Sequence, residues 1–129
     1  RLVLYKRISN AESSDQLREL QVEMIDRFGL LPEQTKTLFR VTALKLRAEK
    51  LGIKKLDAGP DGGKIEFAQS TPVDPFTIVQ LIQAEPHRYR LPTANQLSFE
   101  ENMEAPETRF QKIEKLFERL EQKIHGNVP

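Results

Sequence analysis

The chain has 129 residues, a length that fits one globular domain. Hydrophobic residues make up 38% and charged residues 30%, a composition typical of soluble globular proteins. Lys and Arg number 20 against 19 Asp and Glu, so the net charge of +1 supplies no global field that would attract nucleic acid or an anionic membrane. The absence of cysteine excludes disulfides, thiolate zinc sites and thiol catalysis.

The sequence shows no targeting or membrane-spanning segment. Its apolar runs are far shorter than the roughly 20 residues needed to cross a bilayer, and no signal or transit pattern opens the chain. Because the first residue is Arg1 instead of methionine, we expect the chain to be a piece of a longer polypeptide.

Residues 1–52 predict three helices. The first is short, Ser13 or Ser14 is expected to cap the second, and Gly29 to end it. Pro32 begins the third helix and Gly52 closes it. The stripes expected to face inward are Leu17, Leu20, Met24 and Phe28 on the second helix, and Leu38, Val41, Leu44, Ala48 and Leu51 on the third.

Residues 53–101 predict a hairpin, a helix and a second hairpin. Strands at 53–58 and 64–68 flank a turn-rich segment, Asp74 and Pro75 begin a helix that Pro86 stops, and strands follow at 88–91 and 96–100. Tyr89 and Leu91 are expected to face inward on the first of these two strands. A long helix over 106–125 completes a single α+β domain with a small antiparallel sheet.

No pattern in the sequence predicts an active site, a metal site or a cofactor site. Residues 59–63 lack the spacing and the Gly-Lys-Ser/Thr ending of a phosphate-binding loop, so a tight hairpin turn is the better interpretation. His87 and His125 have no partner at the spacing of metal ligands or of a catalytic triad. We therefore expect a domain that is not an enzyme.

Acidic residues line one side of the second helix. Glu19, Glu23 and Asp26 recur at i, i+4 and i+7. One interpretation is a solvated surface; the other is a docking face for a basic partner, because arginine forms bidentate pairs with carboxylates. Val22 and Ile25 cannot share one narrow stripe with the inward residues, which indicates either burial among several helices or a partly apolar contact patch.

Basic residues share a side of the third helix. Lys36, Arg40 and Arg47 line it, with Lys50 nearby, and such a row could contact phosphates weakly. No aromatic stacking platform accompanies the row, so surface charge balanced by neighbouring acids is the preferred interpretation. A nucleic-acid-binding accessory module remains the alternative function.

Several segments in order along the whole chain carry a family resemblance. They are Arg1-Leu2-x-x-Tyr5-Lys6-Arg7-Ile8, Glu23-x-Ile25-Asp26-Arg27-Phe28-Gly29-Leu30-Leu31-Pro32, Leu51-Gly52-Ile53, Gly62-Gly63-x-Ile65-Glu66-Phe67 and Tyr89-Arg90-Leu91. With these segments the chain closely resembles the C-terminal domain of bacterial transcription-repair coupling factors. The helicase motor motifs of that family, including the Gly-Lys-Thr phosphate loop, are absent from this chain.

The resemblance implies a regulatory role inside a large cytoplasmic bacterial protein, an ATP-dependent translocase on double-stranded DNA that acts on stalled RNA polymerase. In that family the C-terminal domain docks on the N-terminal module that binds the damage-recognition protein of nucleotide excision repair, and masks it. Family docking carboxylates match Glu23 and Asp26 here, and helical geometry adds Glu19. Contact with the repair protein and the polymerase would be indirect, with direct binding of nucleic acid or membrane not expected.

Overall fold

The computed structural model describes residues 2–122 and divides the chain into two compact units. We call Arg1–Arg47 the helical unit and Ala48–Pro129 the sheet unit. The sequence predicts that the whole chain folds as a single domain, and this stays a prediction. None of the helices within residues 2–122 is both long enough and apolar enough to cross a membrane.

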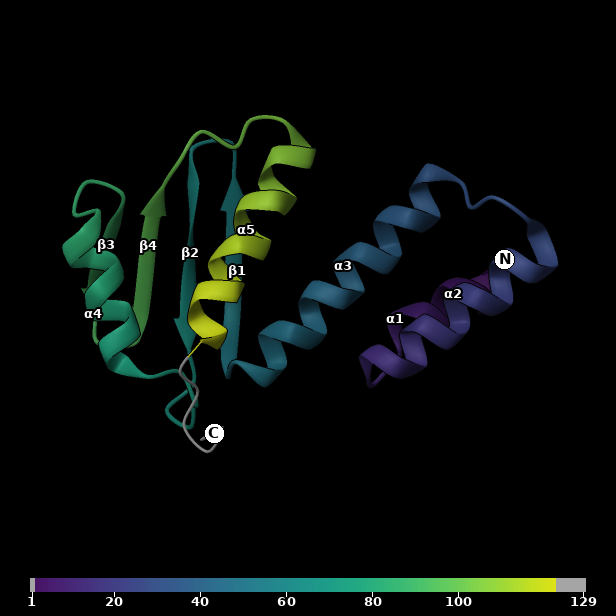
Figure 1. The fold of residues 1–129 in the computed structure, drawn as a ribbon, viewed down its shortest axis with the longest axis horizontal. Helices are drawn as coiled ribbons and strands as arrows, with labels where there is room; N and C mark the ends of the chain where they lie inside the picture. The colour runs from purple at the N-terminus through teal and green to yellow at the C-terminus, as the bar shows by residue number, and fades with distance from the viewer. Residues whose placement is uncertain (1, 123–129) are drawn as a thin grey trace. The chain divides into compact units, whose positions relative to one another are not determined.

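Three helices build the first unit: α1 (Leu2–Ser9), α2 (Ser14–Phe28) and α3 (Glu33–Lys50), the last continuing three residues past the unit boundary (Figure 1). Ser13 caps α2, since its Oγ accepts a hydrogen bond of 3.1 Å from the Gln16 amide. Gly29 ends α2 with a φ of +77°, and its amide donates to the Ile25 carbonyl at 2.8 Å. Both predicted ends of this helix are confirmed within one residue.

The core of the helical unit draws on all three helices and the loops between them. Partly buried Leu4, Leu38 and Ala43 pack against it. The buried residues that form it are Ile8, Ala11, Leu17, Leu20, Met24, Leu31, Phe39 and Leu46. Three of the four residues predicted to face inward on α2 are among them.

Two of the predicted inward residues in this unit are exposed. Phe28 is 60% exposed at the end of α2, and Val41 is 46% exposed on α3. The buried stripe of α3 is instead Thr35, Phe39, Thr42 and Leu46. Thr42 can be buried because its hydroxyl donates to the Leu38 carbonyl, 2.8 Å away, so no polar group is left unsatisfied there.

The sheet unit is α+β, as predicted. Its elements are β1 (Ile53–Gly59), β2 (Gly62–Phe67), α4 (Pro75–Ala84), β3 (Tyr89–Thr93), β4 (Gln96–Glu100) and α5 (Pro106–Glu121). The strands form one antiparallel sheet in the order β1-β2-β4-β3. The residues beyond 122, where α5 was expected to continue to 125, lie outside the described residues.

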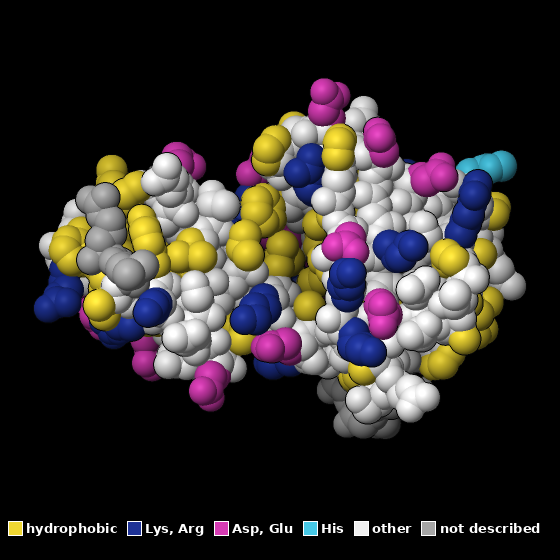
Figure 2. Space-filling model, turned by 180° about the vertical axis from the view of Figure 1, so that it is seen from behind, with side chains coloured by type: hydrophobic (Ala, Val, Ile, Leu, Met, Phe, Trp, Pro, Cys, Tyr) yellow, Lys and Arg dark blue, Asp and Glu magenta, His cyan; other side chains and the backbone are white. Residues whose placement is uncertain are grey.

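One face of this sheet is covered by α4 and α5 (Figure 1). Ile65 and Phe67 on β2, with Leu97 and Phe99 on β4, alternate with polar residues and are buried on that face. The opposite face carries cross-strand neighbours such as Asp57 beside Lys64, and Figure 2 shows charged side chains of both signs interspersed there. Leu91, expected to face inward, is 44% exposed.

Candidate docking face

Three acidic residues lie on one side of α2, the helix that begins after its cap Ser13 and ends at Gly29. Glu19 and Asp26 are exposed, and neither forms an ion pair with any residue in the described range 2–122. Carboxylates that are not ion-paired can bind a cation from elsewhere without first breaking an existing pair. These two residues therefore have the property that the docking interpretation requires.

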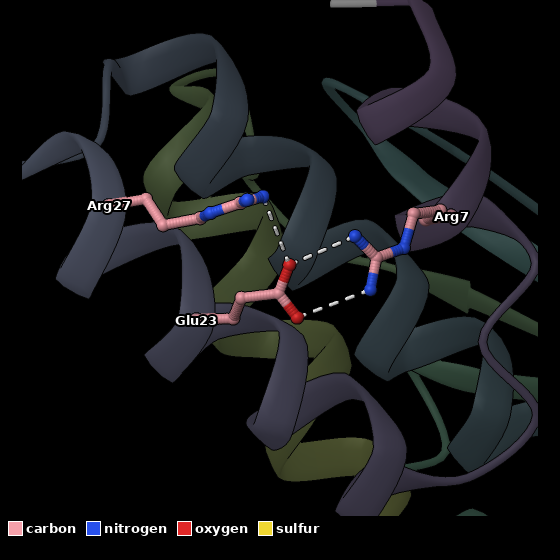
Figure 3. Close-up of polar contacts among 3 residues, drawn as sticks. All are labelled: Arg7, Glu23 and Arg27. Carbon is pink, nitrogen blue, oxygen red and sulfur yellow. Dashed lines mark hydrogen bonds and ion pairs between the residues drawn. The ribbon is translucent and has the colours of Figure 1, made fainter.

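Glu23 differs from the other two because its carboxylate is already bound. Arg7 of α1 donates to both of its oxygens, Nη1 to Oε2 at 3.0 Å and Nη2 to Oε1 at 3.2 Å (Figure 3). Arg27, one turn further along α2, lies 3.7 Å from the same Oε2. The hydrogen bonds from Arg7 and its positive charge lower the pKa of Glu23 below its ordinary value, with a smaller contribution from Arg27.

The bidentate pair joins two helices. Arg7 and Glu23 are separated by 16 positions and hold α1 beside α2. Both side chains remain about two-fifths exposed, at 43% and 39%, so the pair is accessible to a competing cation. A partner arginine that approached Glu23 would have to displace Arg7 or share the carboxylate with it.

Apolar side chains are exposed next to these carboxylates. Val22 is 55% exposed and Ile25 is 46% exposed on the same helix, and Leu30, in the loop that follows, is 94% exposed. Of the two interpretations of Val22 and Ile25 left open by the sequence, burial among several helices is wrong for this structure. The α2 surface thus combines carboxylates with apolar groups, as interfaces between proteins commonly do.

The basic side of α3 is less available than its sequence spacing indicates. Lys36 is exposed and pairs with Glu33 one turn earlier, at 3.5 Å. Arg40 and Arg47 are half-buried, and each already takes part in an interaction within the protein. Phosphate contact by these three residues stays a prediction. Because all three already interact within the protein, their positive charges are less available to phosphates than the sequence spacing indicates.

Of the segments considered for chemistry, the glycine-rich one forms part of a hairpin. Pro60 and Asp61 form the turn between β1 and β2, and the strand ends Gly59 and Gly62 pair on either side of it. His87 is exposed after α4, and His125 lies outside the described residues. Within residues 2–122 no group of three or more His, Asp or Glu side chains is placed to hold a metal ion.

Sequence patterns did not reveal the contact between Arg7 and Glu23. The two residues lie on different helices, so neither the helical period nor the residue spacing places them together. The exposure of Phe28 and Leu30 was also missed. The sequence feature that indicates this exposure is the apolar run Phe-Gly-Leu-Leu-Pro. Its glycine ends the helix, so the inward stripe cannot be extrapolated past it.

Comparison with known proteins gives consistent results. Residues 1–78 match the TRCF domain family. The transcription-repair-coupling factor of Escherichia coli (strain K12) is 40% identical over 122 residues, which cover 95% of this chain and 11% of that protein. The corresponding protein of Haemophilus influenzae is 53% identical over 90 residues, 70% of this chain and 8% of that protein.

A solved structure shares the fold. The crystal structure of the C-terminal domain of transcription-repair coupling factor has a TM-score of 0.70 to this chain, with 95% of this chain and 81% of that one covered at 20% identity. The fold is that of a small α+β domain whose α2 face carries carboxylates beside exposed apolar groups. The chain belongs to the TRCF domain family, and it spans about a tenth of the length of the curated relatives it matches.

Proposed function

We propose that the chain is the regulatory docking domain of a bacterial transcription-repair coupling factor. It docks on the N-terminal module of the same polypeptide, the module that binds the damage-recognition protein of nucleotide excision repair, and masks it. Activation of the parent protein at a stalled RNA polymerase releases the contact. The parent is an ATP-dependent translocase on double-stranded DNA in the bacterial cytoplasm, and this domain contributes regulation instead of catalysis.

One observation carries the proposal: Glu19 and Asp26 are exposed on α2 and have no ion-pair partner within residues 2–122. The family resemblance assigns docking contacts to the positions of Glu23 and Asp26. Asp26 satisfies both conditions, so it is the central residue of the proposed contact. The partner surface is expected to present arginine, whose planar fork binds a carboxylate through two hydrogen bonds.

The energetics suit a reversible contact. Exposed charge pairs contribute only about 0–1 kcal/mol each and are screened by salt. When two surfaces belong to one polypeptide, their effective concentration can reach the millimolar range, so weak pairs suffice to keep them together. A modest competing free energy then opens the contact, whereas a very tight interface would stay closed.

The experiment titrates this chain with the parent polypeptide truncated before the domain, which retains the N-terminal module. We expect Asp26→Asn to raise the Kd several-fold at low salt and to reduce the dependence of the Kd on salt. Glu23→Ala combined with Asp26→Ala should weaken binding further while the domain stays folded by circular dichroism. In the full-length protein, the same variants should bind the damage-recognition protein more tightly, because the mask is weakened.

Asp57→Asn is the matched control, since it removes the same charge from an exposed position on β1, in the sheet unit. A charge swap tests the contact directly: Asp26→Arg should abolish binding, and an arginine-to-glutamate change on the partner should restore it. If Asp26→Asn and Asp57→Asn bind the partner equally across the whole salt series, the acidic-face mechanism is wrong.

The alternative, a nucleic-acid-binding module that uses Lys36, Arg40 and Arg47, has its own test. Fluorescence anisotropy of labelled duplex DNA at low salt would show tight binding that falls steeply with added salt if these residues contact phosphates. We expect no such binding, because Lys36 has an acidic neighbour and the two arginines already interact within the protein.

A further inference from the structure

An exposed apolar ridge runs along α2. Val22, Ile25 and Phe28 recur at i, i+3 and i+6 and are 55%, 46% and 60% exposed. Residues at this spacing lie on one side of a helix and form a continuous ridge. Contiguous exposed apolar side chains of this kind mark contact surfaces.

The ridge ends at an apolar hollow. The hollow has a volume of about 530 Å³ and is formed by α1, the end of α2 and the loop into α3. None of the described residues that line it is charged, and Phe28 belongs to both the ridge and the hollow. Its other apolar lining residues include Leu4, Tyr5, Met24, Leu31 and Pro32.

The dimensions fit the side of another helix. At a rise of about 1.5 Å per residue, the ridge from Val22 to Phe28 is about 9 Å long. Apolar residues at i, i+3 or i+4, and i+7 of a partner helix span a similar length, about 10 Å. A ridge of this kind packs into the groove between side-chain rows of a second helix, and the hollow would receive one large apolar side chain at its end.

The charge beside the ridge specifies one flank of the partner. Asp26 lies one turn after Val22 and Glu19 lies three residues before it, so both carboxylates border the same side of the ridge. Neither forms an ion pair with a residue within the described part of the chain. A helix that packs on the ridge therefore needs lysine or arginine along the flank that faces these two residues.

We propose that the ridge and hollow bind an amphipathic helix whose apolar stripe is bordered on one side by basic residues, supplied by the rest of the parent polypeptide. This inference names the chemistry of the partner at the docking face and so rests on the proposed function. The apolar stripe provides the buried centre of the contact, and the carboxylates of α2 form its charged rim. The charge pairs at this rim set the register of the partner helix, and the apolar centre supplies the affinity.

The test compares Val22→Ser and Ile25→Ser with Val41→Ser, all titrated by calorimetry with the parent polypeptide truncated before this domain. Val41 is a matched control, because it is 46% exposed on α3 and lies outside the ridge. Each ridge variant should raise the Kd about tenfold, whereas Val41→Ser should stay within about twofold. All three positions are exposed, so the variants should retain the wild-type circular dichroism spectrum.

The salt dependence separates this inference from the proposed function. Ridge variants should weaken binding at every salt concentration with an unchanged salt slope, while Asp26→Asn should reduce the slope. If Asp26→Asn weakens binding and both ridge variants do not, the apolar contact is wrong and the docking function stands. If wild-type protein does not bind the truncated parent at all, both are wrong.

A photoreactive side chain at position 25 identifies the occupant. We expect cross-links to partner residues spaced by three or four positions, since those lie on one side of a helix. Cross-links to alternate residues would mean that a strand occupies the ridge, and cross-links between two copies of this chain would mean self-association. Either result overturns the inference of an amphipathic helix from the parent polypeptide.

Discussion

Glu23 already has a structural contact in the surface that we propose for docking. Its carboxylate is bound through both oxygens by Arg7, which fixes α1 against α2, yet the pair stays partly exposed. A docking partner that uses Glu23 must compete with a residue of the same domain. Asp26 has no such competitor within the described residues, so the two carboxylates should contribute differently to docking although they lie on one helix face.

Replacing Arg7 should change the titration of Glu23. Arg7 lowers the pKa of Glu23 by hydrogen bonding and by its charge, so Arg7→Gln should raise that pKa toward its ordinary value of 4.5. A lowered folded-state pKa contributes stability above the unfolded-state value, and this contribution is lost as the pH falls through the folded-state pKa. The stability difference between wild type and Arg7→Gln should therefore be complete above about pH 5 and vanish in acid.

Carbon-detected NMR titration of the glutamate carboxyls measures the pKa, and urea unfolding at several pH values measures the stability. Arg18→Gln is the control, because Arg18 pairs at 3.5 Å with Asp15 on the same helix and leaves Glu23 untouched. An unchanged Glu23 pKa in Arg7→Gln would mean that the bidentate pair does not persist in solution.

At the scale of the elements, local patterns predicted the helices and strands well. Ser13, Gly29 and Asp74 act through the few residues next to them, so their capping roles could be found from the sequence. The inward stripe of α3 could not, because the prediction followed aliphatic residues and placed Val41 inside. Tertiary packing instead buries Thr42, whose hydroxyl is satisfied by the backbone of its own helix.

The candidate site was predictable to a similar degree. The i, i+4, i+7 row of carboxylates follows from the helical period alone, whereas the excess of apolar residues on α2 left burial among several helices and a contact patch both open. The partner of Glu23 was not predictable, since Arg7 approaches it through the packing of two helices. Spacing finds residues that share a helix face, but it cannot show which charges are already neutralised.

A charge network fastens the elements of the sheet unit, and its loss should be measurable. Glu101, whose side chain is only 12% exposed, pairs with Arg88 at 3.1 Å and with Lys112 of α5 at 3.4 Å. Glu101→Gln removes the negative charge between two cations and should lower the free energy of unfolding by about 1–2 kcal/mol. Urea unfolding followed by circular dichroism measures the change.

Asp57→Asn controls for the general effect of removing a carboxylate. Asp57 pairs with Lys55 at 3.7 Å, but both side chains are about 70% exposed, so its loss should change stability by less than about 0.5 kcal/mol. Equal effects of the two substitutions would show that the Glu101 network adds nothing beyond an ordinary surface pair.

At the scale of the whole molecule, the sequence predicts one domain, whereas the chain forms two compact units whose boundary falls inside α3. Because a unit of 47 residues buries little surface, we expect it to be only marginally stable by itself. Helix formation is cooperative, and α3 is continuous across the boundary, so melting one end of it should destabilise the other. We therefore expect the two units to unfold together.

The chain offers one spectroscopic probe for each unit, because it has no tryptophan and its two tyrosines are Tyr5 and Tyr89. Tyr89→Phe leaves a probe in the helical unit, and Tyr5→Phe leaves one in the sheet unit. Tyrosine fluorescence and circular dichroism should give one urea midpoint within each variant, and comparing the two signals in the same sample removes any effect of the substitution on stability. If fluorescence of Tyr5 changes at a lower urea concentration than the circular dichroism of the same variant, the helical unit unfolds separately. The single-domain prediction would then be wrong, and the docking face on α2 would lie on the less stable part of the molecule.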